Sequence, residues 1–208
     1  MQRLPRRTVL ASLIATAALA TARPQHLRAQ DSTPATGDAS ATPAGAAVLP
    51  RDIILPLSAV QEVVPDITTE TATGENATAV GNPTANRAVT FATADGAHRV
   101  VLSVDRYESA DDASTAFQDA FRASQEVPGV TAEAVADLGE AALIGVVTQG
   151  DETHVGGGAL FGDLIVNATL QAYEGTDANK AIVAELIQRQ AEHAEQALRP
   201  GASPTPAG

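Results

Sequence analysis

Residues 138–173 read LGEAALIGVVTQGDETHVGGGALFGDLIVNATLQAY. Three runs, 143–148, 153–161 and 164–173, are rich in apolar and small residues, and a Gly-Asp pair separates each run from the next. In the third run, Leu164, Val166, Ala168 and Leu170 alternate with Ile165, Asn167, Thr169 and Gln171. Alternation with a period of two is typical of strands that bury one face, and Gly-Asp pairs are typical of tight turns. The stretch therefore predicts a three-stranded antiparallel meander around which the rest of the chain packs.

A helix is predicted directly after the meander, from Thr176 or Asp177 to the breaker Arg199-Pro200-Gly201. Its apolar residues recur at three- and four-residue intervals, namely Val183, Leu186, Ile187, Ala191, Ala194 and Leu198. That spacing places them on one face of a helix, and Gly after the last turn is a common helix end. We expect this face to pack on the meander.

A smaller strand–strand–helix unit precedes the meander. Val89 and Phe91 alternate with polar or small residues, as do Val100, Leu102 and Val104, and Asp95-Gly96 lies between the two runs. This arrangement predicts a β-hairpin with a type I′ turn at Asp95-Gly96. A helix should follow, capped by Ser109-x-x-Asp112 and ended by Pro128-Gly129 after Val127.

The segment before the hairpin is harder to interpret. Ser58-x-x-Gln61 resembles a capping box and predicts a short helix that Pro65 ends. Residues 66–86 are rich in Thr, Ala, Gly and Asn, and they allow two interpretations. Residues 67–73 form an edge strand, or the segment is a mobile flap or a disordered insertion.

These elements predict one α+β domain, residues 49–200. We expect an antiparallel sheet of about five strands, the hairpin plus the meander, packed by two long helices and one short N-terminal helix.

The start of the chain has the pattern of an export signal. Arg6 and Arg7 precede an apolar run over residues 8–20, and Ala20-Thr21-Ala22 is a small-residue cleavage site. This pattern predicts a secretory signal over residues 1–22, cut after Ala22, with cleavage after Ala29 as the alternative. The Arg pair favours the twin-arginine route over an ordinary Sec signal.

Residues 23–48 and 201–208 are rich in Ala, Thr, Pro, Ser and Gly, which predicts a disordered tether and a disordered tail.

Composition excludes several kinds of site. The chain has no cysteine, so disulfides, thiolate metal sites and a lipid-carrying cysteine are excluded.

Removal of residues 1–22 takes away three of the 13 Lys and Arg and none of the 25 Asp and Glu, which leaves a net charge of −15. Such a charge disfavours binding to nucleic acid or to anionic lipid. We expect a secreted or extracytoplasmic protein, soluble after signal cleavage and without a membrane span.

Two features of the meander are candidate ligand-binding residues. Gly156, Gly157 and Gly158 are consecutive within a predicted strand, and His154 precedes them. Three glycines can form a backbone nest for an anion, but glycines inside a strand more often mark a bulge or a close approach of another element. The chain has no His-x-x-x-His pair and no dinucleotide, haem or flavin signature, so we expect neither a metal nor a cofactor.

A catalytic interpretation centres on Ser103, whose neighbours His98 and Asp105 are the right types for a base and an orienting acid. His98 and Ser103 are an odd number of positions apart, so a strand places them on opposite faces. The G-x-S-x-G elbow of many hydrolases is also missing. A hydrolase built around Ser103 or His154 therefore stays the alternative to a non-catalytic binding domain.

The order of these elements resembles a known group. A short Ser-started helix is followed by Val-Asp-Arg-Tyr-Glu-Ser (104–109) leading into an alanine-rich helix, and Leu-Gly-Glu-Ala (138–141) stands before the meander. Over residues 55–198 this pattern is similar to exported actinobacterial sensor-like domains, the extracellular domain of the kinase PknH and the LpqN-type lipoproteins, in the wider Mog1/PsbP-like group. The cysteine pairs and the lipobox of those proteins are absent here. The resemblance implies an exported, non-enzymatic domain that binds an unknown small ligand or protein.

Overall fold

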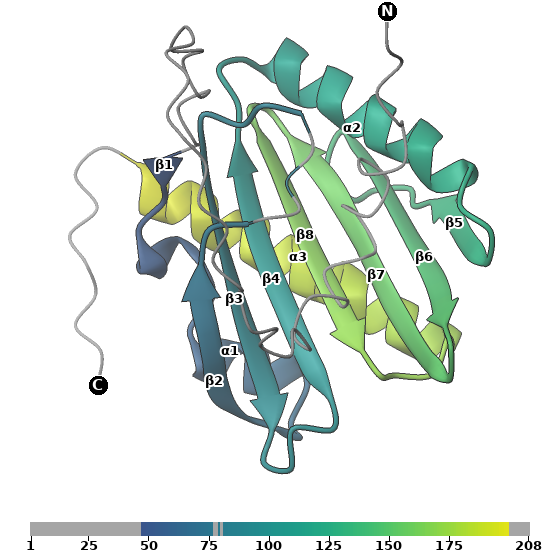
Figure 1. The fold of residues 1–208 in the computed structure, drawn as a ribbon. Helices are drawn as coiled ribbons and strands as arrows, with labels where there is room; N and C mark the ends of the chain where they lie inside the picture. Colours follow the sequence, from purple (N-terminus) through teal and green to yellow (C-terminus); the bar gives the residue numbers. More distant parts are fainter. Residues whose placement is uncertain (1–46, 77–78, 80, 200–208) are drawn as a thin grey trace, which may run out of the picture.

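The computed structural model describes residues 47–76, 79 and 81–199, which form an α+β fold with one open, mixed sheet of eight strands (Figure 1). The strands are β1 (Ala47–Val48), β2 (Ile67–Gly74), β3 (Ala85–Thr93), β4 (Arg99–Arg106), β5 (Val130–Ala134), β6 (Ala141–Gln149), β7 (Glu152–Phe161) and β8 (Leu164–Gln171). The helices are η1 (Arg51–Ile53), α1 (Leu57–Val63), α2 (Ala110–Gln125) and α3 (Asp177–Leu198). The predicted signal residues Arg6, Arg7, Ala20 and Ala22 lie outside the described residues.

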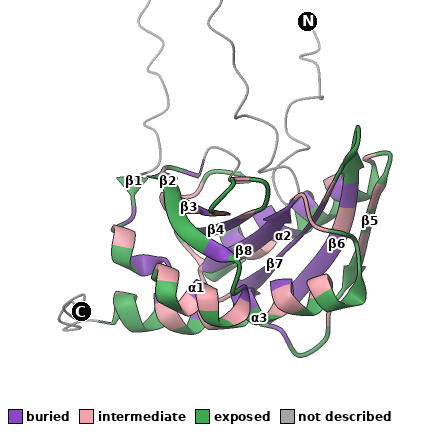
Figure 2. Ribbon diagram, turned by 90° about the horizontal axis from the view of Figure 1, so that it is seen from below, coloured by how far each residue is buried: buried purple, intermediate pink, exposed green. Residues whose placement is uncertain are grey.

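The sheet order is β1-β3-β4-β8-β7-β6-β5, and β2 also pairs with β3. The predicted hairpin is β3–β4, the predicted meander is β6–β7–β8, and the antiparallel pair β4–β8 joins them. Helices α1 and α3 cover one face of this sheet and α2 covers part of the other, as Figures 1 and 2 show. The sheet is mixed because β1 runs parallel to β3.

The predicted number of about five antiparallel strands was wrong. The three additional strands are β1, β2 and β5, and most of their residues are exposed. An exposed strand at the side of a sheet does not need a continuous apolar face, so its sequence lacks the alternation that reveals a buried strand. Of the two interpretations of residues 66–86, the structure shows the edge strand, β2.

Two local predictions also need correction. The loop between β3 and β4 is not a two-residue type I′ turn, because Thr93 N donates to His98 O across four intervening residues and only Gly96 among them has a positive φ, 71°. Asp95 instead accepts hydrogen bonds from Thr93 Oγ1 (2.6 Å) and Ala97 N (3.0 Å), which holds the longer loop together. Helix α1 begins after Pro56, which has a suitable fixed φ, and Ser58 does not cap it.

Gly96→Val is expected to destabilise the fold by roughly 1–2 kcal/mol, because a β-branched residue is strained at positive φ. Nothing lies within 4 Å of a Cβ at Gly96, so the cost is backbone strain alone. Chemical denaturation would measure it, with Ala97→Val in the same loop as the control. Equal stability of the two variants would show that Gly96 does not need its positive φ.

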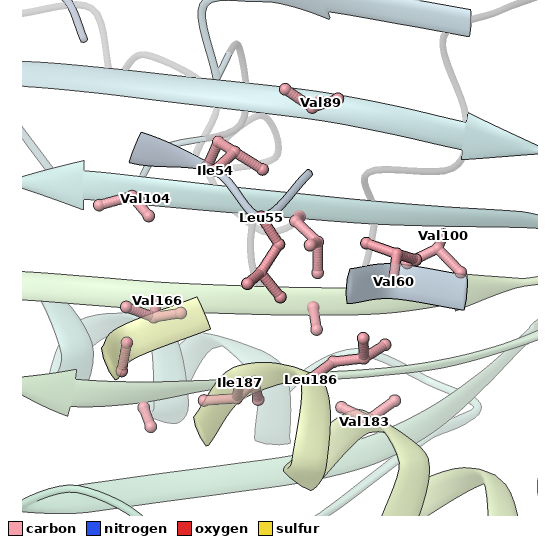
Figure 3. Packing of buried hydrophobic residues seen from close by; sticks show 14 of the residues in the cluster. Ile54, Leu55, Val60, Val89, Val100, Val104, Val166, Val183, Leu186 and Ile187 are labelled. Carbon is pink, nitrogen blue, oxygen red and sulfur yellow. The ribbon is translucent and has the colours of Figure 1, made fainter. Parts of the chain in front are cut away.

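The main core lies between the sheet and the helices α1 and α3 (Figure 3). Strands β3, β4 and β8 contribute alternate residues such as Val89, Val100 and Val166, and α3 contributes the predicted stripe, of which Leu186 and Ile187 are fully buried. A second, smaller cluster lies under α2 on the opposite face, around Phe117.

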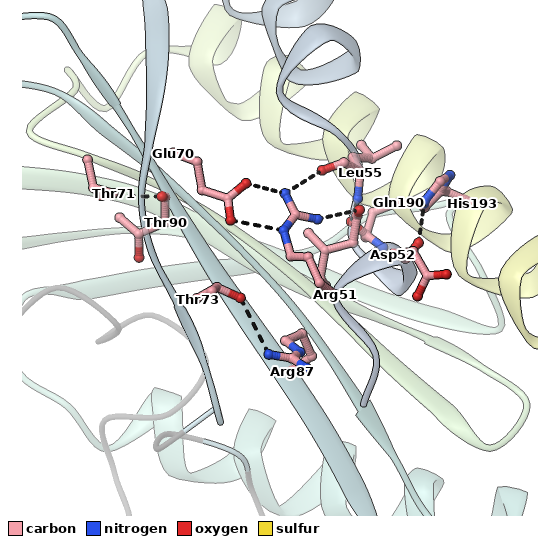
Figure 4. A network of polar contacts seen from close by, with 11 residues as sticks. Arg51, Asp52, Leu55, Glu70, Thr71, Thr73, Arg87, Thr90, Gln190 and His193 are labelled. Carbon is pink, nitrogen blue, oxygen red and sulfur yellow. Dashed lines mark hydrogen bonds and ion pairs between the residues drawn. The ribbon is translucent and has the colours of Figure 1, made fainter. Parts of the chain in front are cut away.

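The segment before α1 is fixed to α3 and β2 by polar contacts that the sequence did not reveal (Figure 4). The buried side chain of Gln190 accepts a hydrogen bond from Leu55 N (3.0 Å) and donates one to Ile53 O (2.7 Å). Arg51 bonds both carboxylate oxygens of Glu70, and this hydrogen bonding holds the pKa of Glu70 below its usual value. Residues 51–55 are therefore anchored against the main core.

Candidate functional site

The face of the sheet that carries α2 also carries a concentration of polar side chains. Helix α2 packs there against β5, β7 and β8. On β4, Val100, Leu102 and Val104 point into the main core, so alternation sends Ser103 and Asp105 to the α2 side. Pairing of β4 with β8 places Asn167 opposite Ser103. Polar residues that are distant in sequence thus meet on one face.

Four of these residues form a hydrogen-bonded group, which we name the Asp105 cluster: Asn76, Ser103, Asp105 and Asn167. Asn76 Nδ2 donates to Asp105 Oδ1 (2.8 Å) and Oδ2 (3.0 Å), and it lies 3.3 Å from Ser103 Oγ. Asn167 Nδ2 donates to Asp105 Oδ2 and to Ser103 Oγ, each at 3.2 Å. Both amide NH₂ groups therefore point towards the carboxylate.

Asn76 reaches the cluster from the loop after β2, and β3 fixes its position. Asn86 on β3 lies opposite Asp105, and its Oδ1 accepts a hydrogen bond from Asn76 N at 2.8 Å. Asn76 and Asn86 are both buried. The main chain of residue 76 is thus attached directly to the strand next to Asp105.

Asp105 is the most unusual group of the cluster. It is 2% exposed, and within residues 47–76, 79 and 81–199 no Lys, Arg or His forms an ion pair with it. Burial raises the pKa of Asp105 to about 7, although the hydrogen bonds from Asn76 and Asn167 oppose this increase. Burial, together with the charge of Asp105, also raises the pKa of Tyr107.

An acceptor next to Asp105 is left without a partner. Asn167 Oδ1 is buried and accepts no hydrogen bond, and among the described side chains it shares this state only with the hydroxyl of Tyr173. A buried acceptor without a donor costs free energy relative to its hydrated state, about 1–3 kcal/mol. Within the described part of the chain, the cluster thus contains both a buried carboxylate without a cation and an amide oxygen without a donor.

The predicted ligand residues Gly156, Gly157, Gly158 and His154 all lie on β7. Gly157 faces the main core, where a Cβ would lie 2.3 Å from Leu143 O. Gly158 and Gly156 face the α2 side and pair with Asn167 and Thr169. His154 is buried further along the strand, and its Nδ1 accepts a hydrogen bond from Ala172 N at 3.2 Å. Burial lowers the pKa of His154. Of these residues, only Gly158 lies directly beside the Asp105 cluster.

Gly157→Ala is expected to destabilise the protein by roughly 1–3 kcal/mol or more, because its Cβ would press on backbone of β6 and force the strands apart. Thermal unfolding would measure the effect. Gly74→Ala is the matched control, since a Cβ at Gly74 meets nothing within 4 Å. If both variants unfold at the wild-type temperature, close strand approach is not the reason for glycine at 157.

The histidines of the catalytic alternative are not brought to Ser103 and Asp105. Ser103 contacts only amide groups in the interactions described above. His98 lies in the β3–β4 loop, where its ring packs at a tilt of 49° against Tyr173, with 4.7 Å between centroids. His154 is four residues along β7 from Gly158, the partner of Asn167. At ~3.3 Å per residue this is about 13 Å along the strand. Neither histidine can take a proton from Ser103 in this arrangement.

A surface hollow of about 510 Å³ lies between the β7–β8 turn and the end of α3. Three of its charged groups have partners, because Arg106 pairs with Asp163 (3.0 Å) and Glu140 Oε1 accepts from Gly162 N (2.8 Å). Among the described residues no group of three or more His, Asp or Glu is arranged to hold a metal ion, and no helix is long and apolar enough to cross a membrane. The Asp105 cluster is therefore the stronger candidate site.

The sequence matches no family model and no curated protein. Among solved structures, the fold is similar to the extracellular domain of PknH from Mycobacterium tuberculosis, with a TM-score of 0.48 and 11% sequence identity over 67% of this chain and 93% of that one. The PknH extracellular domain is one of the proteins that the sequence pattern resembles.

Proposed function

We propose that the protein is an exported, non-catalytic binding domain of the sensor-like kind, and that the Asp105 cluster is its ligand site. The observation that carries this proposal is the buried carboxylate of Asp105, which has no cationic partner among the described residues. A buried acid is costly unless it is paired, and strongly shifted pKa values concentrate at functional sites.

A purely structural role would not need a carboxylate at position 105. An amide fills similar volume and keeps one acceptor for the NH₂ groups of Asn76 and Asn167 without the cost of burying a charge. The unpaired Asn167 Oδ1 adds a second unmet hydrogen-bonding requirement at the same place. A ligand that satisfies both groups explains why they lie together.

A thermal-shift screen of the full chain tests this function, because a compound that binds only the folded state raises the unfolding temperature. The panel contains amino acids, amines, sugars and carboxylates, and it is run on wild type, Asp105→Asn and Asp151→Asn. The last variant removes the same charge from an exposed turn. We expect at least one compound to stabilise wild type and Asp151→Asn but not Asp105→Asn. Equal stabilisation of all three proteins would place the ligand site elsewhere.

Export is a separate part of the proposal, supported by Arg6-Arg7, the apolar run and Ala20-Thr21-Ala22. Replacement of Arg6 and Arg7 by Lys should block secretion if the twin-arginine route is used. Mass spectrometry of the secreted wild type should show a chain that begins at Arg23. Secretion that is unaffected by the Lys pair would exclude that route.

A further inference from the structure

We propose that the ligand of the Asp105 cluster is a small molecule with a primary ammonium group, which binds between the carboxylate of Asp105 and Oδ1 of Asn167. This inference rests on the proposed function, and it adds the chemical class of the ligand. It follows from which hydrogen-bonding groups of the cluster are already used and which remain.

The amide donors of the cluster are directed inward. The NH₂ groups of Asn76 and Asn167 both contact Asp105 and Ser103, and an amide NH₂ offers only two N–H donors. An anionic ligand would therefore meet the charge of Asp105 without finding a free donor on either amide. This argues against a phosphate or carboxylate ligand, and so against the anion nest that Gly156, Gly157 and Gly158 suggested.

Acceptors remain available at the same place. An ionised carboxylate accepts about four hydrogen bonds, and three amide contacts reach Asp105. Asn167 Oδ1 has no hydrogen-bond partner among the described residues. The Nδ2 of the same amide lies 3.2 Å from Asp105 Oδ2, so the two acceptors belong to groups in direct contact. An ammonium group supplies three N–H donors and the missing positive charge.

The strand beside Asn167 carries glycine on this face. Gly158 lies directly opposite Asn167 on β7, and Gly156 is the next residue of that strand on the same face. Gly158 has no side chain to cover the amide, whereas Thr169 fills the space over Gly156, where a Cβ would lie 2.9 Å from Thr169 Oγ1. The glycines that the sequence singled out thus flank the unpaired acceptor and offer no anion-binding group of their own.

The charge state of Asp105 must control such binding. The neighbouring strands place Asn86 and Ile165 beside it, which do not titrate, and Tyr107 follows it on the same face with a raised pKa. Arg99, at the far end of β4, makes no ion pair with it among the described residues. Burial raises the pKa of Asp105 to about 7, so the group is ionised at pH 8 and protonated at pH 5.5. Ammonium affinity should therefore fall roughly thirtyfold between these two pH values.

The experiment titrates the ¹⁵N-labelled full chain with three probes of equal length: n-butylammonium chloride, 1-butanol and sodium butyrate. NMR follows the side-chain amide signals of Asn76 and Asn167 at pH 8 and pH 5.5. Separate titrations with KCl and CaCl₂ are run at matched ionic strength. We expect butylammonium to bind at least tenfold more tightly than either other probe at pH 8, and to lose this preference at pH 5.5. Asp105→Asn should abolish the preference, Asn167→Ala should weaken it, and Asp151→Asn should not change it.

Several outcomes would overturn the ammonium assignment. Equal shifts of the amide signals with 1-butanol would show that the site does not distinguish a charged ligand from a neutral one. Equal shifts with KCl or CaCl₂ would indicate a metal-ion site. No shift with butylammonium, combined with a hit from the thermal-shift panel that needs Asp105, would leave the binding function in place and reject the ligand class. Absence of both would reject the function as well. Circular dichroism of Asp105→Asn and Asn167→Ala excludes loss of fold as the cause.

Discussion

Asp105→Asn is expected to stabilise the protein at pH 8 by up to about 4 kcal/mol. Burial raises the pKa of Asp105 from 3.8 to about 7. Each unit corresponds to about 1.4 kcal/mol of preference for the protonated form in the folded state. At pH 8 the wild type must keep an ionised carboxylate buried, whereas the amide of the variant carries no charge.

The pH dependence of this effect has a defined sign. The folded-state pKa of Asp105 is raised, so its contribution to stability is fully present below pH 3.8, declines as the pH rises, and is lost above about pH 7. Urea unfolding at several pH values between 4 and 8 should therefore show a gap between Asp105→Asn and wild type that widens with pH. Asp151→Asn should show no such gap. If Asp105→Asn were less stable than wild type by the same amount at every pH, the Asp105 carboxylate would not be a buried, uncompensated charge.

Leu186→Ala or Ile187→Ala should destabilise the fold by about 2–5 kcal/mol each. Both side chains are fully buried in the main core between α3 and the sheet. Truncation removes apolar contacts and leaves a cavity that neighbours such as Leu55 and Val60 can fill only in part. Chemical denaturation measures the change directly.

Glu195→Ala is the control for these substitutions, because Glu195 is exposed on the same helix and Ala is a good helix former. We expect it to stay within about 0.5 kcal/mol of wild type. If Leu186→Ala and Ile187→Ala unfolded like this control, the apolar stripe of α3 would not be a core element, and a docking role for it would have to be considered.

Much of the fold could be predicted because its buried elements have strong periodicity. The meander β6–β7–β8 and helix α3 lie close to their predicted bounds, and both long helices have the expected Ser109 and Thr176 caps. The strands β1 and β5 were missed and β2 was left open, because their side chains are mostly exposed and follow no apolar pattern. The joining of the two units through β4 and β8 was also not predictable, since strand order depends on packing between distant segments.

The candidate site was only partly visible in the sequence. Ser103 and Asp105 were recognised as a pair on one strand face, but they were grouped with histidines that lie elsewhere. Asn167 alternates with Leu164, Val166 and Ala168, so its place on the opposite face was predictable. Its position beside Ser103 depends on the β4–β8 pairing, and that of Asn76 on a loop contact with Asn86. Side chains that meet across separate elements leave no local signal.

The most direct test is the titration of Asp105 itself, followed through its side-chain carboxyl carbon by ¹³C NMR in the ligand-free full chain. The structure predicts an apparent pKa of about 7, against 3.8 for an unperturbed aspartate. It also predicts that addition of n-butylammonium chloride lowers this value, because the added positive charge favours the ionised form. A midpoint near 4 in the free protein would contradict the account, since Asp105 would then be either solvated or already paired with a cation.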